Sequence, residues 1–166
     1  MNVFSPPTIP PNPGDSPNLH VFLAGSIEMG QAIDWQQRLV SELAELDVNL
    51  LNPRRADWDK SWPQSPDFAP FREQVEWELA GIHTSDVVFF YFHPGTMSPI
   101  TLLELGLVLN REWPGKMIVC CPSGFWRWGN VKITCDTKGV PVYESLDEAI
   151  KALYDEIIDY NNKISI

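Results

Sequence analysis

Short apolar runs alternate along the chain with longer segments in which apolar residues recur every three or four positions. Apolar runs bounded by polar, glycine or proline residues predict buried strands. They are HVFLAG, VNLLN, DVVFFYF, KMIVCC and VPVYE. The helical spacing between these runs predicts helices over residues 31–46, 71–84 and 98–110, and a last helix from Ser145 to about Tyr160.

This alternation of strands and helices predicts an α/β fold, with a five-stranded parallel sheet and helices on both of its faces. DVVFFYF is continuously apolar after its aspartate, which is typical of a strand covered on both sides. Residues 1–18 include PPTIPPNPGDSPN and predict a flexible, proline-rich N-terminal tail. Residues 19–166 are expected to form a single domain, with a long loop over residues 54–70.

Composition and charge narrow the classes of partner. The 166 residues are 44% apolar and 20% charged, which describes an ordinary globular chain. The net charge is −10 and the twelve basic residues form no long cluster, so nucleic acid is not an expected partner. A small neutral or cationic ligand fits this acidic balance better.

The apolar runs indicate where in the cell the protein is located, and the cysteines indicate whether it has disulfides or a metal site. No apolar run approaches the ~20 residues of a membrane span, and the polar N-terminus lacks a signal-peptide core. We therefore expect a cytoplasmic protein without a membrane partner. Cys120, Cys121 and Cys135 are odd in number and match no zinc spacing, which predicts free thiols and no structural metal.

Ligands of open α/β sheets bind beyond the carboxyl ends of the strands. The loops expected there are AGSIEMG, NPRRADWDKSWPQSP, HPGTMSP and PSGFWRWGN. Gly25 and Ser26 in the first loop allow a ligand to approach backbone N–H groups near a helix start. The chain has neither a GxGxxG fingerprint nor a Walker lysine, so nicotinamide cofactors and nucleoside triphosphate hydrolysis are not supported.

The helix SPITLLELGLVLN is apolar at most positions but holds one carboxylate, Glu104. An ionised glutamate among apolar neighbours is costly unless something holds or uses it. Burial raises the proton affinity of such a group, which is a common preparation for catalysis. The alternative is a partly exposed glutamate on the single polar stripe of the helix.

A second group of carboxylates lies in REQVEWELAGIHTSD, on the helix that leads into the third predicted strand. The first half of a helix antiparallel to the strands lies near their carboxyl ends, so Glu78 can face the same cleft as Glu104. Glycosidic chemistry needs two such carboxylates, one to attack the anomeric carbon and one to move a proton. The alternative for Glu73, Glu76 and Glu78 is a solvated acidic face.

Three segments, FLAGSI, QVEWELAGIHTSD and SPITLLELG, resemble the nucleoside 2-deoxyribosyltransferase family, in its branch of short proteins with an NPRR segment. Related deoxynucleoside monophosphate N-glycosidases share this layout. The resemblance runs from about His20 to Asn130. It implies a flavodoxin-like or Rossmann-like fold, a homo-oligomer, no cofactor, and small-molecule nucleosides and free nucleobases as ligands.

The resemblance also implies the catalytic roles. Glu104 corresponds to the nucleophile, which displaces the base and carries deoxyribose as an ester until a second base or water accepts it. The acid/base residue lies eight positions before Asp86, which is Glu78. Phe22 replaces a first-strand tyrosine that often holds the nucleophile, so a backbone amide or Tyr91 is expected to orient Glu104 instead.

The same resemblance leaves two substrates open. Ser98 lies where many transferases bind sugar hydroxyls with an aspartate, and where the monophosphate hydrolases have a serine that faces phosphate; there Ser98 and Ser26 would cradle it. Glu28 follows GSI where the hydrolases have an arginine, and it would repel phosphate unless Arg54 and Arg55 compensate. We therefore expect a free nucleoside, with the monophosphate as the alternative.

Four further residues are predicted to bind substrate, in addition to Phe22, Gly25, Ser26 and Ser98. Trp58 beside Asp57 offers a base a flat apolar partner and a hydrogen-bonding group. Met97 lies in the loop that leads to Glu104. Asn130 is expected to complete the site of a neighbouring subunit, and its alternative is a simple turn residue. The predicted function is base exchange on 2′-deoxyribonucleosides, with monophosphate hydrolysis or a non-catalytic nucleotide sensor as rivals.

Overall fold

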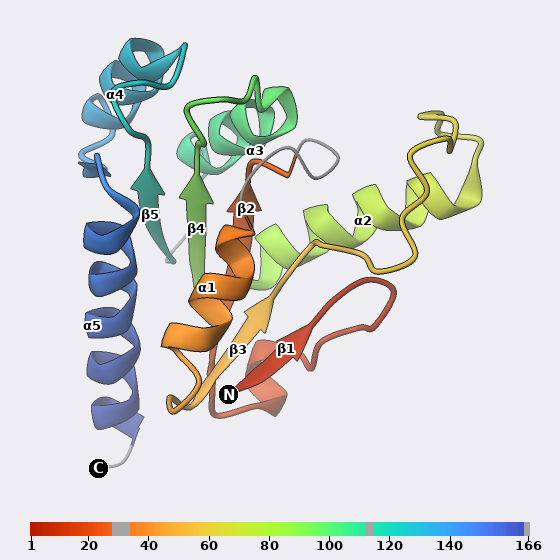
Figure 1. Cartoon of the computed structure of the whole chain (residues 1–166). Helices are drawn as coiled ribbons and strands as arrows, with labels where there is room; N and C mark the ends of the chain where they lie inside the picture. Colours follow the sequence, from red (N-terminus) through yellow and green to blue (C-terminus); the bar gives the residue numbers. More distant parts are fainter. Residues whose placement is uncertain (28–33, 112–114, 165–166) are drawn as a thin grey trace.

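The computed structural model describes residues 1–27, 34–111 and 115–164 (Figure 1). Its centre is a six-stranded sheet in which every neighbouring pair is parallel, in the order β1-β3-β2-β4-β5-β6. The strands are β1 (Asn2–Phe4), β2 (Leu19–Gly25), β3 (Val48–Leu51), β4 (Val87–Tyr91), β5 (Lys116–Cys120) and β6 (Val142–Tyr143). The predicted parallel α/β fold with a flavodoxin-like arrangement is confirmed.

Helices cover both faces of the sheet (Figure 1). One apolar layer contains side chains of α1 and α5, and the other contains side chains of α2, α3 and α4. The helices are η1 (Pro13–Asp15, a 3-10 turn), α1 (Trp35–Glu42), α2 (Ala69–Thr84), α3 (Pro99–Leu109), α4 (Trp128–Asp136) and α5 (Leu146–Ile164).

Strand β4 shows why the run DVVFFYF is apolar throughout. Phe89 and Tyr91 belong to the layer beneath α1 and α5, whereas Phe90 and Phe92 belong to the layer beneath α2 and α3. Successive strand residues point to opposite faces, so a strand covered on both sides has no position that favours a polar residue.

The sheet has six strands where five were predicted. The additional strand is β1, which lies in the proline-rich segment expected to be a flexible tail and pairs with β3 through Val3 and Leu50. The segment is also bound farther along, since Trp77 Nε1 donates to the Thr8 carbonyl at 2.9 Å. A three-residue strand has no readable periodicity, so only its long-range pairing reveals it.

Other expected elements need smaller adjustments. The final helix is capped as predicted, with Ser145 Oγ accepting from the Glu148 backbone N–H at 3.2 Å, and it continues to Ile164. The segment GFWRWGN leads into α4, which the sequence analysis did not predict. Residues 31–33 of the first predicted helix lie outside the described residues.

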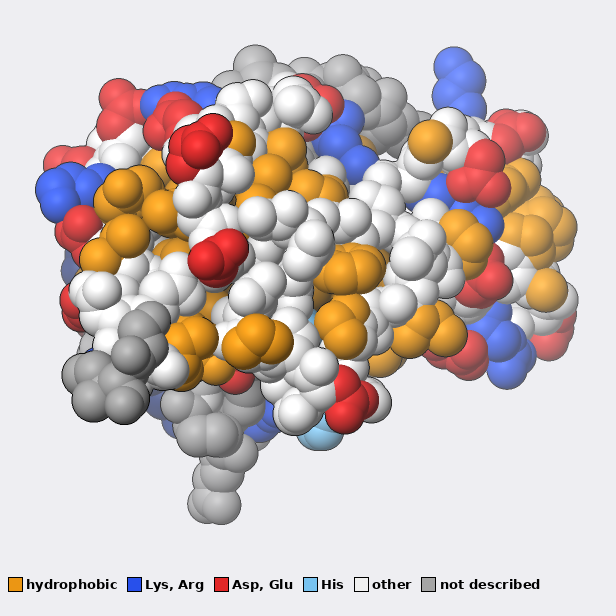
Figure 2. Space-filling model, turned by 90° about the horizontal axis from the view of Figure 1, so that it is seen from below, with side chains coloured by type: hydrophobic (Ala, Val, Ile, Leu, Met, Phe, Trp, Pro, Cys, Tyr) orange, Lys and Arg blue, Asp and Glu red, His pale blue; other side chains and the backbone are white. Residues whose placement is uncertain are grey.

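The surface agrees with the scattered charges of the sequence. On the face shown in Figure 2, Lys and Arg side chains lie among acidic ones and do not gather into one basic surface. Within the described part of the chain, no helix is long and apolar enough to cross a membrane.

The strand order also marks where a ligand site belongs. From β2 the chain moves to β3 on one side, and it then returns to β4 on the other side of β2. Loops that leave the carboxyl ends of β2 and β4 therefore diverge, and ligands of open α/β sheets bind at such a point.

Candidate functional site

The carboxyl ends of β2 and β4 form the floor of the candidate site. Gly25 pairs with Tyr91 in register, and the Ser26 backbone N–H donates to the Tyr91 carbonyl at 3.0 Å. A Cβ atom on Gly25 would lie 2.6 Å from both the Trp35 ring and the Tyr91 carbonyl oxygen. Glycine is therefore required here by the packing of α1 against the two strand ends.

A cluster of three buried hydroxyls joins the two loops above this floor. Ser26 Oγ lies 2.5 Å from Ser98 Oγ, and Thr96 Oγ1 lies 2.9 Å from the first and 2.7 Å from the second. The backbone N–H of His93 also donates to Ser26 Oγ at 2.9 Å. The structure thus brings together Ser26 and Ser98, two predicted substrate-binding residues that are far apart in the sequence.

The cluster controls how α3 begins. Ser98 has left-handed backbone angles, φ 46° and ψ 51°, which are unfavourable for a residue with a side chain. Pro99 follows as the first helical residue, a position that proline favours. Because the Ser98 side chain is tied to Ser26 and Thr96, the loop fixes the start and direction of the helix that carries Glu104.

Glu104 is buried on the inner side of α3, with 8% of its surface exposed. Thr101, Leu105 and Val108 are buried on the same helix. Burial, followed by the charge of Glu78, raises the pKa of Glu104 to about 8. The Glu104 carboxyl therefore retains its proton near neutral pH in the free protein.

Glu78 comes from α2, on the same side of the sheet. Burial raises its pKa, and a hydrogen bond from Gln74 Nε2 to Glu78 Oε1, 2.8 Å long, opposes this rise. The Gln74 amide also donates to the Pro53 carbonyl at 2.9 Å, so it is held between the loop and the helix. The two carboxylates of α2 and α3 are therefore electrostatically coupled, and the one with a hydrogen-bond donor ionises first.

Tyr91, the side chain expected to orient Glu104, and Phe22, which replaces the first-strand tyrosine, lie on opposite faces of the sheet. Tyr91 packs against Trp35 with ring centroids 5.4 Å apart, in the layer of α1 and α5, so it lies on the face opposite α3. Phe22 lies on the face of α2 and α3 but is fully buried, with its ring 6.1 Å from that of Trp77. Phe22, which was predicted to bind substrate, is therefore a core residue beneath the site, because its side chain has no exposed surface in the structure.

Asp57 and Trp58 belong to a different cluster. Asp57 is exposed and accepts from Arg55 Nε at 2.7 Å, while Arg55 Nη1 donates to Glu73 of α2 at 2.8 Å. Trp58 contacts the Trp62 ring at 5.2 Å between centroids. Figure 1 shows this loop and the first turns of α2 extending away from the carboxyl ends of β2 and β4.

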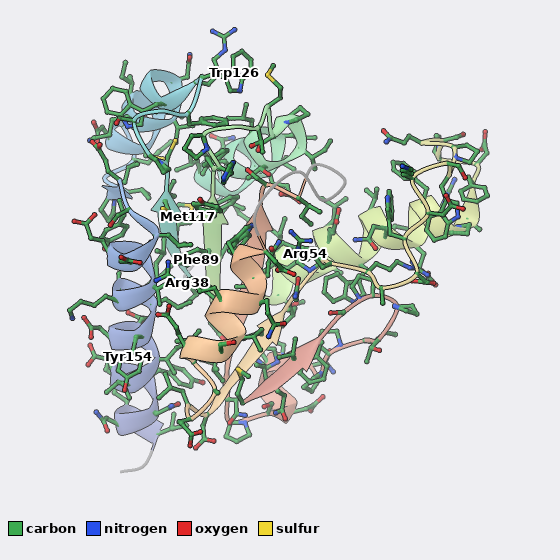
Figure 3. All side chains as sticks on the ribbon, in the orientation of Figure 1. Arg38, Arg54, Phe89, Met117, Trp126 and Tyr154 are labelled. Atoms are coloured by element: carbon green, nitrogen blue, oxygen red, sulfur yellow. The ribbon has the colours of Figure 1, made fainter. Side chains whose placement is uncertain are left out.

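Two other predicted residues lie at exposed positions. Met97 is 53% exposed, and its carbonyl accepts from Trp126 Nε1 at 3.1 Å, near the top of the view in Figure 3. Asn130 is exposed in the first turn of α4. Glu28 lies outside the described residues.

Three buried polar residues were not predicted from the sequence. Gln74 is the carboxamide that holds Glu78, one helical turn away, and this spacing was the available signal. Gln36 of α1 is fully buried and bonded to Arg54 at 2.9 Å. Figure 3 shows Arg54 between α1 and α2. Thr96 completes the hydroxyl cluster with Ser26 and Ser98.

Comparison with known families now adds to this geometry. Residues 18–125 match the family described as "Nucleoside 2-deoxyribosyltransferase like", which is more than half of the chain. The chain is a member of the nucleoside 2-deoxyribosyltransferase-like family. The match includes Glu78, Glu104 and the Ser26–Ser98 pair, and it ends before α4. A search among curated proteins returned no match.

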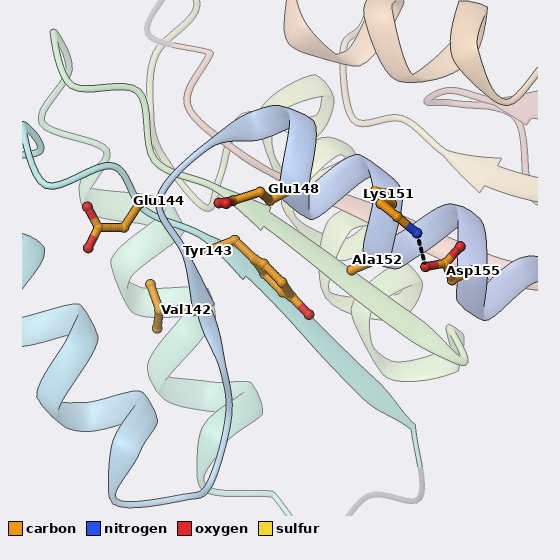
Figure 4. Close-up of a pocket in the computed structure, with 7 residues that line it drawn as sticks. All are labelled: Val142, Tyr143, Glu144, Glu148, Lys151, Ala152 and Asp155. Atoms are coloured by element: carbon orange, nitrogen blue, oxygen red, sulfur yellow. Dashed lines mark hydrogen bonds and ion pairs between the residues drawn. The ribbon is translucent and has the colours of Figure 1, made fainter.

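This membership confirms the family resemblance seen in the three motifs, whereas the NPRR branch stays a prediction. The structure also has a hollow of about 640 Å³ at the edge of the sheet (Figure 4), and this hollow lies outside the residues that match the family. That hollow is lined by residues of β6 and α5 and by Glu144 between them, all of which follow the matched residues in the chain. Its Lys151 is paired with Asp155 at 2.6 Å. The carboxylates of the nucleoside 2-deoxyribosyltransferase-like region lie instead on α2 and α3.

Proposed function

We propose that the protein is a nucleoside 2-deoxyribosyltransferase that exchanges nucleobases on 2′-deoxyribonucleosides. The observation that carries this proposal is a pair of carboxylates on neighbouring helices of one face of the sheet, the half-buried Glu78 of α2 and the buried Glu104 of α3, whose pKa values are both raised by burial. A retaining N-glycosidic exchange requires one carboxylate as nucleophile and one as proton carrier.

The first step uses the single proton that the pair holds at intermediate pH. Glu104 passes this proton to Glu78, which converts Glu104 into the anion and Glu78 into the acid. A Glu104 oxygen then attacks C1′ of deoxyribose while the bond from C1′ to the base nitrogen breaks. The electrons of that bond go to the base, and Glu78 protonates the leaving nitrogen.

The second step reverses the roles. An acceptor base gives its N–H proton to the Glu78 carboxylate as its nitrogen attacks C1′. The ester bond to Glu104 breaks, and the pair again holds one proton. Two inversions at C1′ retain the configuration, and no cofactor takes part in this scheme.

An intact-mass experiment tests the nucleophile. Incubation with a 2-fluoro-2-deoxynucleoside should add one fluorodeoxyribosyl group to the protein, because fluorine slows the release of the ester. Glu104→Gln should fold and gain no adduct. Gln37→Leu, at an exposed position of α1, is the matched control and should gain it fully. An adduct on Glu104→Gln, or none on the parent protein, would contradict the proposal, and the latter result would favour the sensor.

The buried hydroxyl cluster at the start of α3 favours one rival, hydrolysis of a deoxynucleoside monophosphate. Ser26, Thr96 and Ser98 place hydroxyl groups near the N-terminus of a helix, where anions are stabilised. Supplying an acceptor base distinguishes the two reactions. A transferase yields a new nucleoside, whereas a hydrolase yields only the free base and deoxyribose phosphate.

We also propose that a second copy of the chain covers α3. Three apolar side chains form a stripe at helical spacing on its outer side: Ile100 is 58% exposed, Leu103 is 60% exposed and Leu107 is 50% exposed. The stripe carries no charge, so it can pack against itself about a twofold axis although the chain has a net charge of −10. Glu104 borders the stripe, and such a contact would shield the site from water.

Light scattering with size-exclusion chromatography tests this interface. The parent protein should elute as an oligomer, and Leu103→Lys should shift it toward the monomer because it places a charge in the stripe. Tyr154→Lys, which replaces an exposed apolar residue on α5, is the matched control. A monomeric parent protein, or no shift in Leu103→Lys, contradicts the interface.

A further inference from the structure

Three buried polar atoms, on α1, on α2 and in the loop after β3, have no hydrogen-bond partner among the described residues. They are Gln36 Nε2, Arg54 Nη2 and Gln74 Oε1. Gln36 is fully buried and Gln74 is 5% exposed. Buried polar atoms of native proteins are usually paired, so such a group in or beside a site indicates a partner that arrives with the ligand.

Existing bonds determine which end of each amide is unpaired. Gln36 Oε1 accepts from Arg54 Nε at 2.9 Å, so the nitrogen of Gln36 is its unpaired end. Gln74 Nε2 donates to the Pro53 carbonyl and to Glu78 Oε1, which are both acceptors. The oxygen of Gln74 is therefore its unpaired end.

The three side chains are linked to one another through the loop after β3, and one of them, Gln74, contacts the proton carrier. Gln74 binds Glu78 on one side and the carbonyl of Pro53 on the other, and Pro53 directly precedes Arg54. Arg54 in turn binds Gln36, and its own side chain is 24% exposed, so the group reaches solvent there. A base bonded to C1′ must lie close to Glu78 if Glu78 protonates its nitrogen.

The chemistry of these atoms is two donors and one acceptor. A lactam edge, in which a ring carbonyl adjoins a ring N–H, offers the complementary acceptor and donor. Uracil, thymine, hypoxanthine and guanine have this edge, whereas cytosine and adenine have an amino group in place of the carbonyl. An amino group of the base is itself a hydrogen-bond donor. It would face the N–H donors of Arg54 and Gln36, and none of these donors would find an acceptor.

Resting on the function proposed above, we infer that Gln36, Arg54 and Gln74 recognise the base and select lactam bases over amino bases. A neutral carbonyl suits the two donors better than a phosphate does. Arg54 Nε lies 3.4 Å from Asp34 Oδ1, so the guanidinium charge is already partly balanced by a carboxylate.

Base binding to Glu104→Gln tests the selection without depending on catalysis. Calorimetry should show hypoxanthine binding about ten- to a hundredfold more tightly than adenine, the range expected for one well-placed polar pair. Gln36→Leu in the same background should reduce this ratio to within about threefold, because half of the donor pair is lost. Gln37→Leu, at the neighbouring exposed position, should leave the ratio unchanged.

Several outcomes overturn the inference. Equal binding of the two bases, no binding of either, or an unchanged ratio in Gln36→Leu each contradict it. Tight binding of inorganic phosphate that Gln36→Leu abolishes would assign the donors to a phosphate instead. Failure of the proposed function is a separate result, since it appears as the absence of the fluorodeoxyribosyl adduct while base selection can still be measured.

Discussion

The two ends of the sheet both bury polar side chains, but they treat them differently. At the amino end, the buried Asn49 side chain bonds with Asn2 at 2.9 Å and with Ser16 at 2.9 Å, and the half-buried Asp86 accepts from the His20 backbone N–H at 2.9 Å. At the carboxyl end, Glu104 is buried with its pKa raised to about 8. The first arrangement fastens the N-terminal segment, whereas the second stores a group that is costly to bury.

This difference helps to distinguish structural from functional polar residues. Polar groups that serve the fold are paired, because pairing offsets the cost of removing them from water. Groups that serve chemistry remain reactive and often reduce stability. Sequence alone makes Asn49 and Glu104 look alike, since each is a polar residue within an apolar run.

The pH dependence of base exchange should show the largest effect. Above pH 8 the pair loses its last proton, so Glu78 cannot protonate the leaving base, and kcat/KM should fall about tenfold per pH unit. At low pH both groups are protonated and the nucleophile is absent, which gives a bell-shaped profile. Gln74→Leu removes the bond that lowers the pKa of Glu78, so the acidic limb should move to higher pH.

A pH-rate profile measured under kcat/KM conditions checks this prediction. Gln37→Leu is the control, since it changes a neighbouring glutamine without touching the carboxylates. A rate that stays constant between about pH 6 and pH 10 would show that the pair does not control the reaction.

Stability should also respond to pH at the carboxyl end. The folded pKa of Glu104, about 8, exceeds the ordinary glutamate pKa of 4.5, so between these values the folded state holds a proton that the unfolded state has released. The free energy of unfolding should therefore fall as pH rises from about 4.5 to about 8 and then level off. Glu104→Gln should remove this slope and stabilise the protein at pH 8 by a few kcal/mol, roughly.

Urea denaturation at several pH values measures this effect. The wild-type and Glu104→Gln curves should converge near pH 4.5, where the wild-type group is protonated in the folded state and half-protonated in the unfolded state. Equal stabilities of the wild-type protein and Glu104→Gln at pH 4.5 and at pH 8 would contradict the burial of Glu104.

A substitution at the amino end of the sheet should have the smallest effect on catalysis. It should still lower stability clearly. Asn49→Ala removes hydrogen bonds to Asn2 and Ser16 and should lower the free energy of unfolding by about 1–3 kcal/mol. Base-exchange activity per folded molecule should stay within about twofold of the parent, because the change lies at the opposite end of the sheet. Chemical denaturation and initial-rate assays test the two halves of this prediction, and a large loss of activity would erase the contrast between the two ends.

Much of the fold could be predicted from the sequence because long periodic segments report local burial directly. The run HVFLAG lies within β2, which begins one residue earlier, and the runs VNLLN, DVVFFYF and KMIVCC contain β3, β4 and β5. Strand β1 and helix α4 could not be predicted in this way, since β1 is short and depends on β3 for its pairing. Weak local signals of this kind become structure only through contacts with distant residues.

For the candidate site, motif spacing identified Ser26, Ser98, Glu78 and Glu104 as residues to examine. It did not identify Gln36 or Gln74. These residues stand out only in the structure, where each side-chain amide is hydrogen-bonded at one end and has an unpaired buried atom at the other. It also suggested Tyr91 as a partner of Glu104, which the structure places on the opposite face of the sheet.

The sequence by itself determined the α/β class, the family, and the presence of a carboxylate in an apolar helix, because these follow from composition, periodicity and motif order. Only the tertiary structure decided that Ser26 meets Ser98, that Glu78 and Glu104 share one side of the sheet, and that Gln74 holds Glu78. The physical reason is that pKa values and hydrogen-bond satisfaction depend on neighbours in space, and burial and pairing are fixed only when distant segments pack together.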